Sequence, residues 1–134
     1  MTVVTTSRKP LPEVRSLARD LAFALQERFF SRGKMGLEEI FRENRTVLLV
    51  SSRRRAYFFE LFVDGEPLVS IAVAGFSVDT RAGEIRRGLC TGNRALYDDL
   101  KEYLSVVYTD ALDPRTLAFD GTQRKHYTLT VGEA

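Results

Sequence analysis

The chain is poor in the side chains that build covalent links, metal sites and membrane spans. It has one cysteine, Cys90, and one histidine, His126, among 134 residues. A single cysteine excludes an internal disulfide, and the apolar runs at 46–50 and 68–75 are far shorter than the ~20 residues of a membrane helix. The beginning of the chain also lacks the charged and then apolar layout of a secretory signal. These absences predict a reduced, cytoplasmic protein that does not enter a membrane.

Patterns of catalytic and cofactor sites are also missing. The sequence has no glycine-rich phosphate loop and no cluster of histidine and cysteine at zinc-ligand spacing. Cys90 lies in an apolar strand context and His126 in an alternating strand pattern, so we expect both to be structural. One acidic cluster suggests a metal or a general base but is typical of a solvated helix face: Glu38, Glu39 and Glu43. We therefore expect no catalytic residue, no metal and no cofactor.

Charge is present in both signs, but it is unevenly divided along the chain. Residues 1–56 contain 12 Lys and Arg against 6 Asp and Glu, whereas residues 57–134 contain 8 against 12. This asymmetry predicts that the first half faces a polyanion, with the acidic half facing solvent or a protein. Arginine outnumbers lysine 16 to 4, which suits phosphate and base contacts in RNA but also follows from GC-rich coding.

The periodicity of apolar residues predicts short helices between strands. Val14, Leu17, Leu21 and Leu25 recur at helical spacing, whereas the run TVLLV is typical of a strand buried on both faces. The expected helices are 12–28, 37–44 and 94–108. The expected strands are 2–4, 28–32, 46–50, 56–63, 67–74, 85–90, 117–120 and 126–131, with a turn at Asp64 and Gly65.

Helices distributed among strands in a chain of this length predict one domain, residues 1–134, with an α/β (α+β) fold. We expect a mixed β-sheet packed with about three helices. A strand, a corner with a hydroxyl residue and an arginine, and a helix occur twice, at TTSRKP (5–10) and at LCTGNR (89–94). This repetition predicts two quasi-repeated halves.

The stretch TTSRKP joins the first expected strand to the first expected helix. Two interpretations of this corner are open. Its hydroxyl groups could cap the helix, with two exposed cations beside them, or its side chains could bind phosphate. A backbone phosphate cradle is excluded because the stretch has no glycine and its proline lacks an N–H donor. Any phosphate must therefore be bound by side chains.

TTSRKP and the later SRGKMGLEEIF (31–41), which leads into TVLLV, together resemble the beginning of the Brix domain in its short archaeal form. In that family a TSR-x-P corner precedes the first helix and an RGK turn precedes the second. The resemblance covers about the first 50 residues. It implies a ribosome-biogenesis factor involved in rRNA processing that binds ribosomal RNA, with a fold similar to the anticodon-binding domain of class II aminoacyl-tRNA synthetases.

The residues that we expect to contact RNA are cations and one hydroxyl at the corner, at the RGK turn and in a later basic run: Ser7, Arg8, Lys9, Arg15, Arg32, Lys34, Arg53, Arg54 and Arg55. The basic run is followed by Tyr57, Phe58 and Phe59, and rings beside cations suit single-stranded RNA. Because side chains alternate along a strand, at least one of Phe58 and Phe59 must point into the core.

The leading hypothesis is thus a non-enzymatic RNA-binding factor in ribosome biogenesis that contacts (pre-)rRNA through its basic first half. The alternative is a protein-interaction scaffold that docks ribosomal or assembly proteins with little direct RNA contact. A third hypothesis, RNA cleavage dependent on Glu39, has no catalytic constellation behind it.

Overall fold

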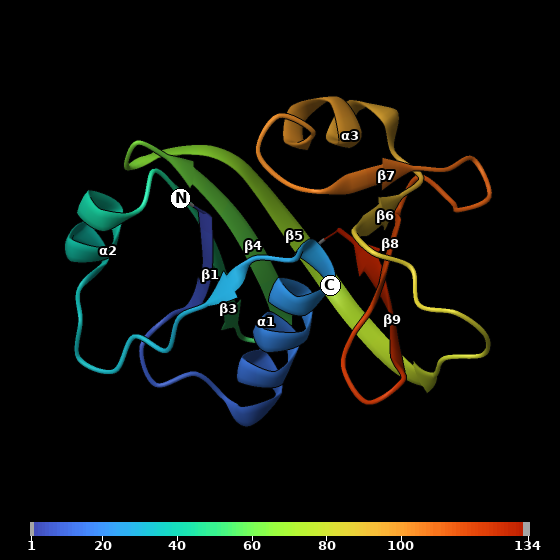
Figure 1. The fold of residues 1–134 in the computed structure, drawn as a ribbon, viewed down its shortest axis with the longest axis horizontal. Helices are drawn as coiled ribbons and strands as arrows, with labels where there is room; N and C mark the ends of the chain where they lie inside the picture. Colours follow the sequence, from blue (N-terminus) through green and yellow to red (C-terminus); the bar gives the residue numbers. More distant parts are fainter. Residues whose placement is uncertain (1, 133–134) are drawn as a thin grey trace.

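The computed structural model describes residues 2–132. In chain order its elements are β1 (Thr2–Thr6), α1 (Pro12–Leu25), β2 (Arg28–Phe29), α2 (Leu37–Glu43), β3 (Thr46–Arg53), β4 (Ala56–Val63), β5 (Glu66–Thr80), β6 (Leu89–Thr91), α3 (Arg94–Leu100), β7 (Val106–Tyr108), β8 (Thr116–Asp120) and β9 (Lys125–Val131). The strands form one mixed sheet in the order β2-β1-β3-β4-β5-β9-β8-β6-β7 (Figure 1). The prediction of a mixed sheet with about three helices is confirmed.

The main core lies between α1 and the inner face of the sheet. The apolar stripe of α1, including Leu17 and Leu21, is buried against residues from both ends of the strand order, among them Val4 and Leu117. This contact is possible because the sheet curls around α1, so β1 and β8 both touch the helix. The helical spacing in the sequence therefore identifies correctly the face that forms the core.

A second, smaller core lies on the outer face of β1 and β3. Val3 and Val47 are buried there under Ile40 of α2, and the ring of Phe41 lies 4.9 Å from that of Phe62. Alternate residues of β1 and β3 are thus buried on opposite faces, as the apolar run TVLLV predicts.

The two halves of the chain repeat the same strand order on either side of β5. The first half gives β2-β1-β3-β4 and the second gives β7-β6-β8-β9. In each half a helix, α1 or α3, joins two parallel strands. β3 is parallel to β1, whereas β8 is antiparallel to β6. Two consecutive strands can be parallel only if a crossover of a dozen or more residues joins them. The connection from β2 to β3 is such a crossover and contains α2. The connection from β7 to β8, residues 109–115, is too short for one. The second half consequently has no counterpart of α2.

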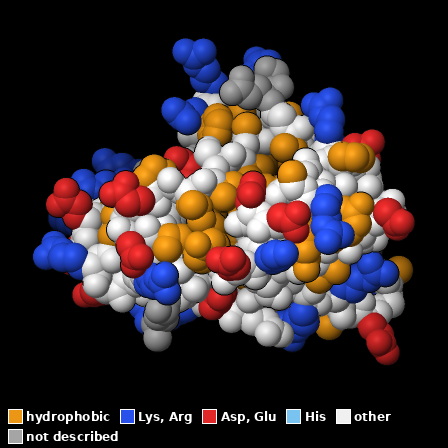
Figure 2. Space-filling model, turned by 90° about the horizontal axis from the view of Figure 1, so that it is seen from above, with side chains coloured by type: hydrophobic (Ala, Val, Ile, Leu, Met, Phe, Trp, Pro, Cys, Tyr) orange, Lys and Arg blue, Asp and Glu red, His pale blue; other side chains and the backbone are white. Residues whose placement is uncertain are grey.

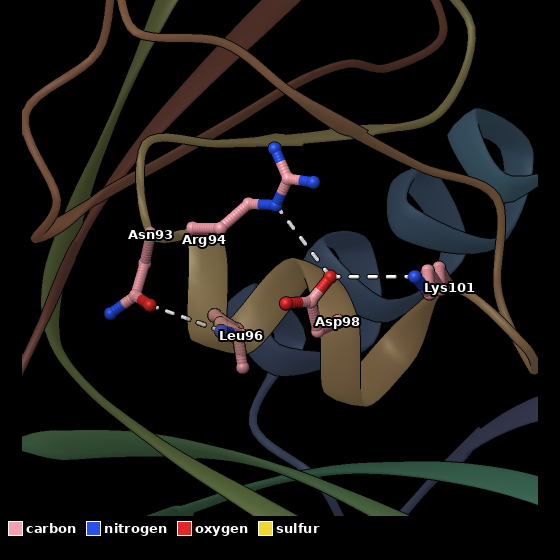
Figure 3. Close-up of polar contacts among 5 residues, drawn as sticks. All are labelled: Asn93, Arg94, Leu96, Asp98 and Lys101. Atoms are coloured by element: carbon pink, nitrogen blue, oxygen red, sulfur yellow. Dashed lines mark hydrogen bonds and ion pairs between the residues drawn. The ribbon is translucent and has the colours of Figure 1, made fainter.

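The predicted helix 94–108 is wrong in length, because α3 ends at Leu100. Asn93 begins the helix by accepting a hydrogen bond from the Leu96 N–H at 3.0 Å, and Asp98 pairs with Arg94 and Lys101 (Figure 3). The apolar spacing continues past the helix. However, the β-branched residues at 106 and 107 pair with β6 and form β7 instead.

The helix predicted to reach residue 28 also ends earlier. Gln26 adopts a left-handed conformation with φ of 59°, and the N–H groups of Gln26 and Glu27 bond back to the carbonyls of Phe23 and Ala22. This is the Schellman arrangement, which ends a helix sharply. It places the end of α1 at Leu25.

Several strands have boundaries that differ from the prediction, because their length depends on the strands with which they pair. The strand expected at 67–74 extends to Thr80, because its last residues pair with β9. The strand expected at 85–90 is shortened to Leu89–Thr91, and that at 28–32 to Arg28–Phe29. The expected turn at Asp64 and Gly65 is confirmed; both residues have positive φ, 53° and 81°, as a two-residue hairpin turn requires.

A buried carboxylate connects α1 to the turn between β8 and β9. Asp20 accepts hydrogen bonds from the backbone N–H and the hydroxyl of Thr122 at 3.1 and 2.7 Å and from the phenol of Tyr127. The ammonium of Lys125 lies 2.7 Å from it. Gly121 allows the close approach, because a Cβ there would lie 2.8 Å from the Asp20 side chain. Burial by itself would raise the pKa of Asp20, but these hydrogen bonds outweigh it and the pKa is lowered.

We predict that Asp20→Asn lowers the free energy of unfolding at neutral pH by about 2 to 3 kcal/mol, because it leaves the Lys125 ammonium without its charge partner. The folded-state pKa of Asp20 lies below its ordinary value of 3.8. The carboxylate therefore stabilises the fold above that value and loses this effect as pH falls through the folded pKa. Urea unfolding at several pH values should show the two proteins converging in acid. A difference that is independent of pH would contradict this account.

Candidate nucleic-acid interface

The corner between β1 and α1 does not cap the helix. Leu11 is the N-cap residue of α1, and no side chain accepts a hydrogen bond from the first turn. The hydroxyl of Thr5 instead donates to the carbonyl of Phe30 at 2.6 Å, and the N–H of Ser7 donates to the carbonyl of Val50 at 3.2 Å. Of the two interpretations of TTSRKP, capping is therefore wrong.

Two arginines clamp the corner to the RGK turn. A terminal nitrogen of Arg8 donates to the carbonyl of Lys34 at 2.8 Å. Arg32 donates from Nε to the carbonyl of Met35 at 3.1 Å and from Nη1 to the carbonyl of Thr6 at 3.3 Å. These bonds use backbone carbonyls as acceptors. Both positive charges thus lie at the junction without an acidic partner in these bonds.

The corner and the turn enclose a hollow of about 200 Å³. Its lining includes five of the predicted site residues: Ser7, Arg8, Lys9, Arg15 and Arg32. Lys34 is exposed next to it, and its carbonyl holds Arg8. The pKa of Arg32 is lowered by burial and then by the charge of Arg8, so the guanidinium stays charged but its charge costs more free energy here than in water. An anion in the hollow would relieve that cost.

The basic run 53–55 forms the tip of the β3–β4 hairpin, at the same end of the sheet as the corner. β3 runs parallel to β1, with Val50 opposite Thr6, and continues to Arg53. The guanidinium of Arg53 lies 4.5 Å from the centroid of the Phe58 ring, and Phe59 is buried. The prediction that one of the two rings points inward is confirmed.

The hairpin is also attached to the first turn of α1. The phenol of Tyr57 donates to a carboxylate oxygen of Glu13 at 2.7 Å. Burial and this bond raise the pKa of Tyr57 to about 12. The bond gives the carboxylate of Glu13 a hydrogen-bond donor from β4.

Strand direction brings a second group of cations to the same end. β5 and β8 run in the direction of β1, so β5 ends and β9 begins where β1 ends. We call this end the arginine end (the lower edge in Figure 1). Its cations are Arg8, Lys9, Arg15, Arg32, Lys34, Arg53, Arg54, Arg55, Arg81, Arg86, Arg124 and Lys125.

The acidic half of the chain, which we expect to face solvent or a protein, also contributes cations to this end. Its net charge conceals four cations at the arginine end, in the segments 81–86 and 124–125. Sequence reasoning missed them because their place depends on strand direction. The available signal was their position at turns that begin or end a strand.

The opposite end of the molecule has a different surface. Figure 2 shows it from above, with acidic side chains interspersed among basic ones and apolar side chains between them. The exposed pair of Arg45 and Asp64 belongs to this end, with Nε 3.5 Å from the carboxylate. Charge is thus polarised between the two ends of the sheet rather than between the two halves of the chain.

Three cations at the arginine end have a backbone conformation that L-residues rarely adopt. Lys9, Arg54 and Arg124 have φ of 49°, 58° and 60°. Glycine adopts positive φ at little cost, whereas other residues pay on the order of 1 kcal/mol. A cation is present at each of these positions instead. Gln26 and Asp64 have positive φ as well, at a helix end and a hairpin turn, so the strain by itself assigns no function to the three cations.

We predict that Arg54→Gly raises the free energy of unfolding by up to about 1 kcal/mol, because it relieves the left-handed strain at the hairpin tip. The Arg54 side chain is exposed and contributes little packing. Thermal or urea unfolding measures the change, and Arg55→Gly, at the neighbouring position with ordinary φ, is the matched control. Equal destabilisation by both substitutions would contradict the strain argument.

The remaining candidates from the sequence are acidic residues of α2, Cys90 and His126. Glu38 and Glu39 are exposed on the first turn of α2, and the part of the chain that the structure describes holds no group of three His, Cys, Asp or Glu side chains able to bind a metal. Cys90 is buried, and burial raises the pKa of its thiol. His126 contacts Asp120 at 2.7 Å. Between residues 2 and 132, no helix has the length and apolar character needed to cross a membrane.

Comparison with known proteins identifies the fold. The sequence matches no family model and no curated protein. Among solved structures, an archaeal Imp4-like protein named Mil is similar, with a TM-score of 0.63 and 19% identity over 96% of this chain and 95% of that one. A probable ribosomal biogenesis protein from Aeropyrum pernix K1 gives a TM-score of 0.60 and 23% identity over 99% and 96%. This chain shares their fold. At such identities the likeness extends to architecture alone, and function has to be argued from the site.

Proposed function

We propose that this protein is a non-enzymatic RNA-binding factor of ribosome biogenesis, and that the arginine end binds the phosphate backbone of ribosomal RNA. The observation that carries the proposal is the hollow where Arg8 and Arg32 face each other without a carboxylate among their hydrogen-bond partners. The description of one similar structure as a probable ribosomal biogenesis protein and the Brix-like motifs at 5–10 and 31–41 support the same class of function.

The arrangement suits an extended polyanion better than a single nucleotide. Cations lie at several successive turns along one end of the sheet, and a phosphate backbone presents charges at regular intervals. Arginine binds phosphate bidentately, and its plane can stack on an unpaired base. The proposed contacts are with the residues predicted from the sequence, namely Ser7, Arg8, Lys9, Arg15, Arg32, Lys34, Arg53, Arg54 and Arg55.

A second candidate function is docking of ribosomal or assembly proteins with little RNA contact. The observation that favours it is β7, an edge strand whose Val107 and Tyr108 are exposed. Unpaired strand edges of this kind accept an additional strand from a partner. Such docking would depend little on the cations at the arginine end, which allows the two functions to be separated.

We predict that binding to short single-stranded RNA weakens with salt. About four phosphate contacts give a log-log slope of about −3, since each contributes about −0.7. Arg8→Ala with Lys9→Ala should lower the affinity for every RNA sequence and make the slope shallower by about 1.4. Fluorescence anisotropy across a salt series measures both quantities.

The matched control is Arg42→Ala with Arg45→Ala, which removes the same charge from the same half of the chain. Arg45 directly precedes the first residue of β3, at the end of the sheet opposite the corner. This pair should leave the slope unchanged. Equal losses from the two double variants would mean long-range attraction only, and salt-independent binding would favour the protein scaffold.

A further inference from the structure

The outer face of the second half has a hollow of about 200 Å³. Cys90 of β6 and Ala118 of β8 are directly paired and form its floor, because their neighbours Leu89 and Leu117 point to the opposite face, toward α1. Ala111 and Leu112 form one wall. Small side chains on a sheet give this floor a flat apolar surface.

The hollow is open because this half lacks a counterpart of α2. In the first half, α2 covers the outer face with Ile40 against Val3 and Val47. In the second half, only the connection 109–115 passes over the outer face, and it approaches closely at Gly92, where a Cβ would lie 2.3 Å from the Leu112 carbonyl oxygen. The repeated architecture thus leaves one apolar sheet surface without a helix.

Polar groups converge at the mouth of the hollow. Asp120 is buried, and its two carboxylate oxygens accept from the Arg86 N–H at 2.8 Å and contact His126 Nδ1 at 2.7 Å. When an imidazole contacts a carboxylate through Nδ1, its Nδ1 carries the proton and donates it to the carboxylate. Nε2 of His126 is then the ring nitrogen left to bond a ligand, and His126 lines this hollow.

Cations flank the mouth on the side of the arginine end. Arg86 and His126 line both the apolar hollow and an adjoining polar one, which also includes Arg81 and the exposed acid Glu84. Arg124 donates to the carbonyl of Arg81 at 3.3 Å. Arg81 and Arg86 line the polar hollow together with Glu84 and the buried Asp120, and Arg124 adds a third arginine beside them. Three arginines against two carboxylates leave room for an anion next to the apolar slot. A ligand with a flat ring and a neighbouring phosphate meets both requirements.

We propose that this hollow binds one unstacked nucleobase of a single-stranded RNA segment, with Arg81 and Arg86 on the adjoining phosphate and His126 Nε2 on the base edge. The inference rests on the proposed RNA-binding function and extends it from the corner to the second half of the chain. The cavity is too small for a whole nucleotide, so the sugar and phosphate remain at the mouth. Recognition of single-stranded RNA commonly uses such extruded bases.

The test compares a short mixed-sequence RNA with an abasic strand of the same length. Ala118→Leu fills the floor of the hollow and should weaken binding of the base-bearing RNA by about tenfold, a typical contribution of one bound base. Binding of the abasic strand should not change. Arg8→Ala with Lys9→Ala should weaken both ligands equally, because it removes phosphate contacts.

Two further variants keep the test decisive. Ala111→Phe fills the hollow from its exposed rim and should act like Ala118→Leu even if the latter fails to fold. Ala95→Leu places the same added bulk on the exposed surface of α3 and should have no effect. If the filled variants bind the base-bearing RNA as tightly as the wild type does, the base site is overturned, but the proposed RNA-binding function is not. Absence of RNA binding by the wild type would overturn the proposed function with it.

Discussion

The position of the interface depends on the buried carboxylate of Asp20. Its hydrogen bonds to Thr122 and Tyr127, with the ammonium of Lys125, hold α1 against the turn between β8 and β9. The first turn of α1 contributes Arg15 to the hollow at the corner. The Asp20 contacts therefore hold the curled sheet in a form in which the cations of both halves of the chain lie at one end.

Folding and the proposed phosphate binding place opposite demands on that end of the molecule. Left-handed backbone at Lys9, Arg54 and Arg124 would be less strained with glycine. Arg8 and Arg32 lie close enough for the charge of Arg8 to lower the pKa of Arg32. Each of these features costs stability in the free protein. In the proposed function, bound phosphate would offset the charge repulsion between Arg8 and Arg32.

Features that depend on local sequence could be predicted. The helical spacing of α1, the apolar run of β3 and the turn at Asp64 and Gly65 each contain their own signal. The end of α3 could not be predicted, because Leu100 and Leu104 continue the helical spacing of apolar residues. Residues 106–108 nevertheless leave the helix and pair with β6. The far half of β5 depends on β9, and the second group of arginines depends on strand direction. Both are properties of the assembled sheet, so the candidate contact residues predicted from the sequence come only from the first half of the chain.

The central claim is that RNA binds along the arginine end and not elsewhere on the molecule. The most direct test is to titrate the isotope-labelled protein with a short single-stranded RNA and follow the backbone amide resonances by NMR. The account predicts shifts at residues 7–9, 31–34 and 53–55 and also at 81–86 and 122–125, with α3 and the turn at Asp64 unchanged. Shifts centred on α3 and the Asp64 turn, with the corner unaffected, would contradict it.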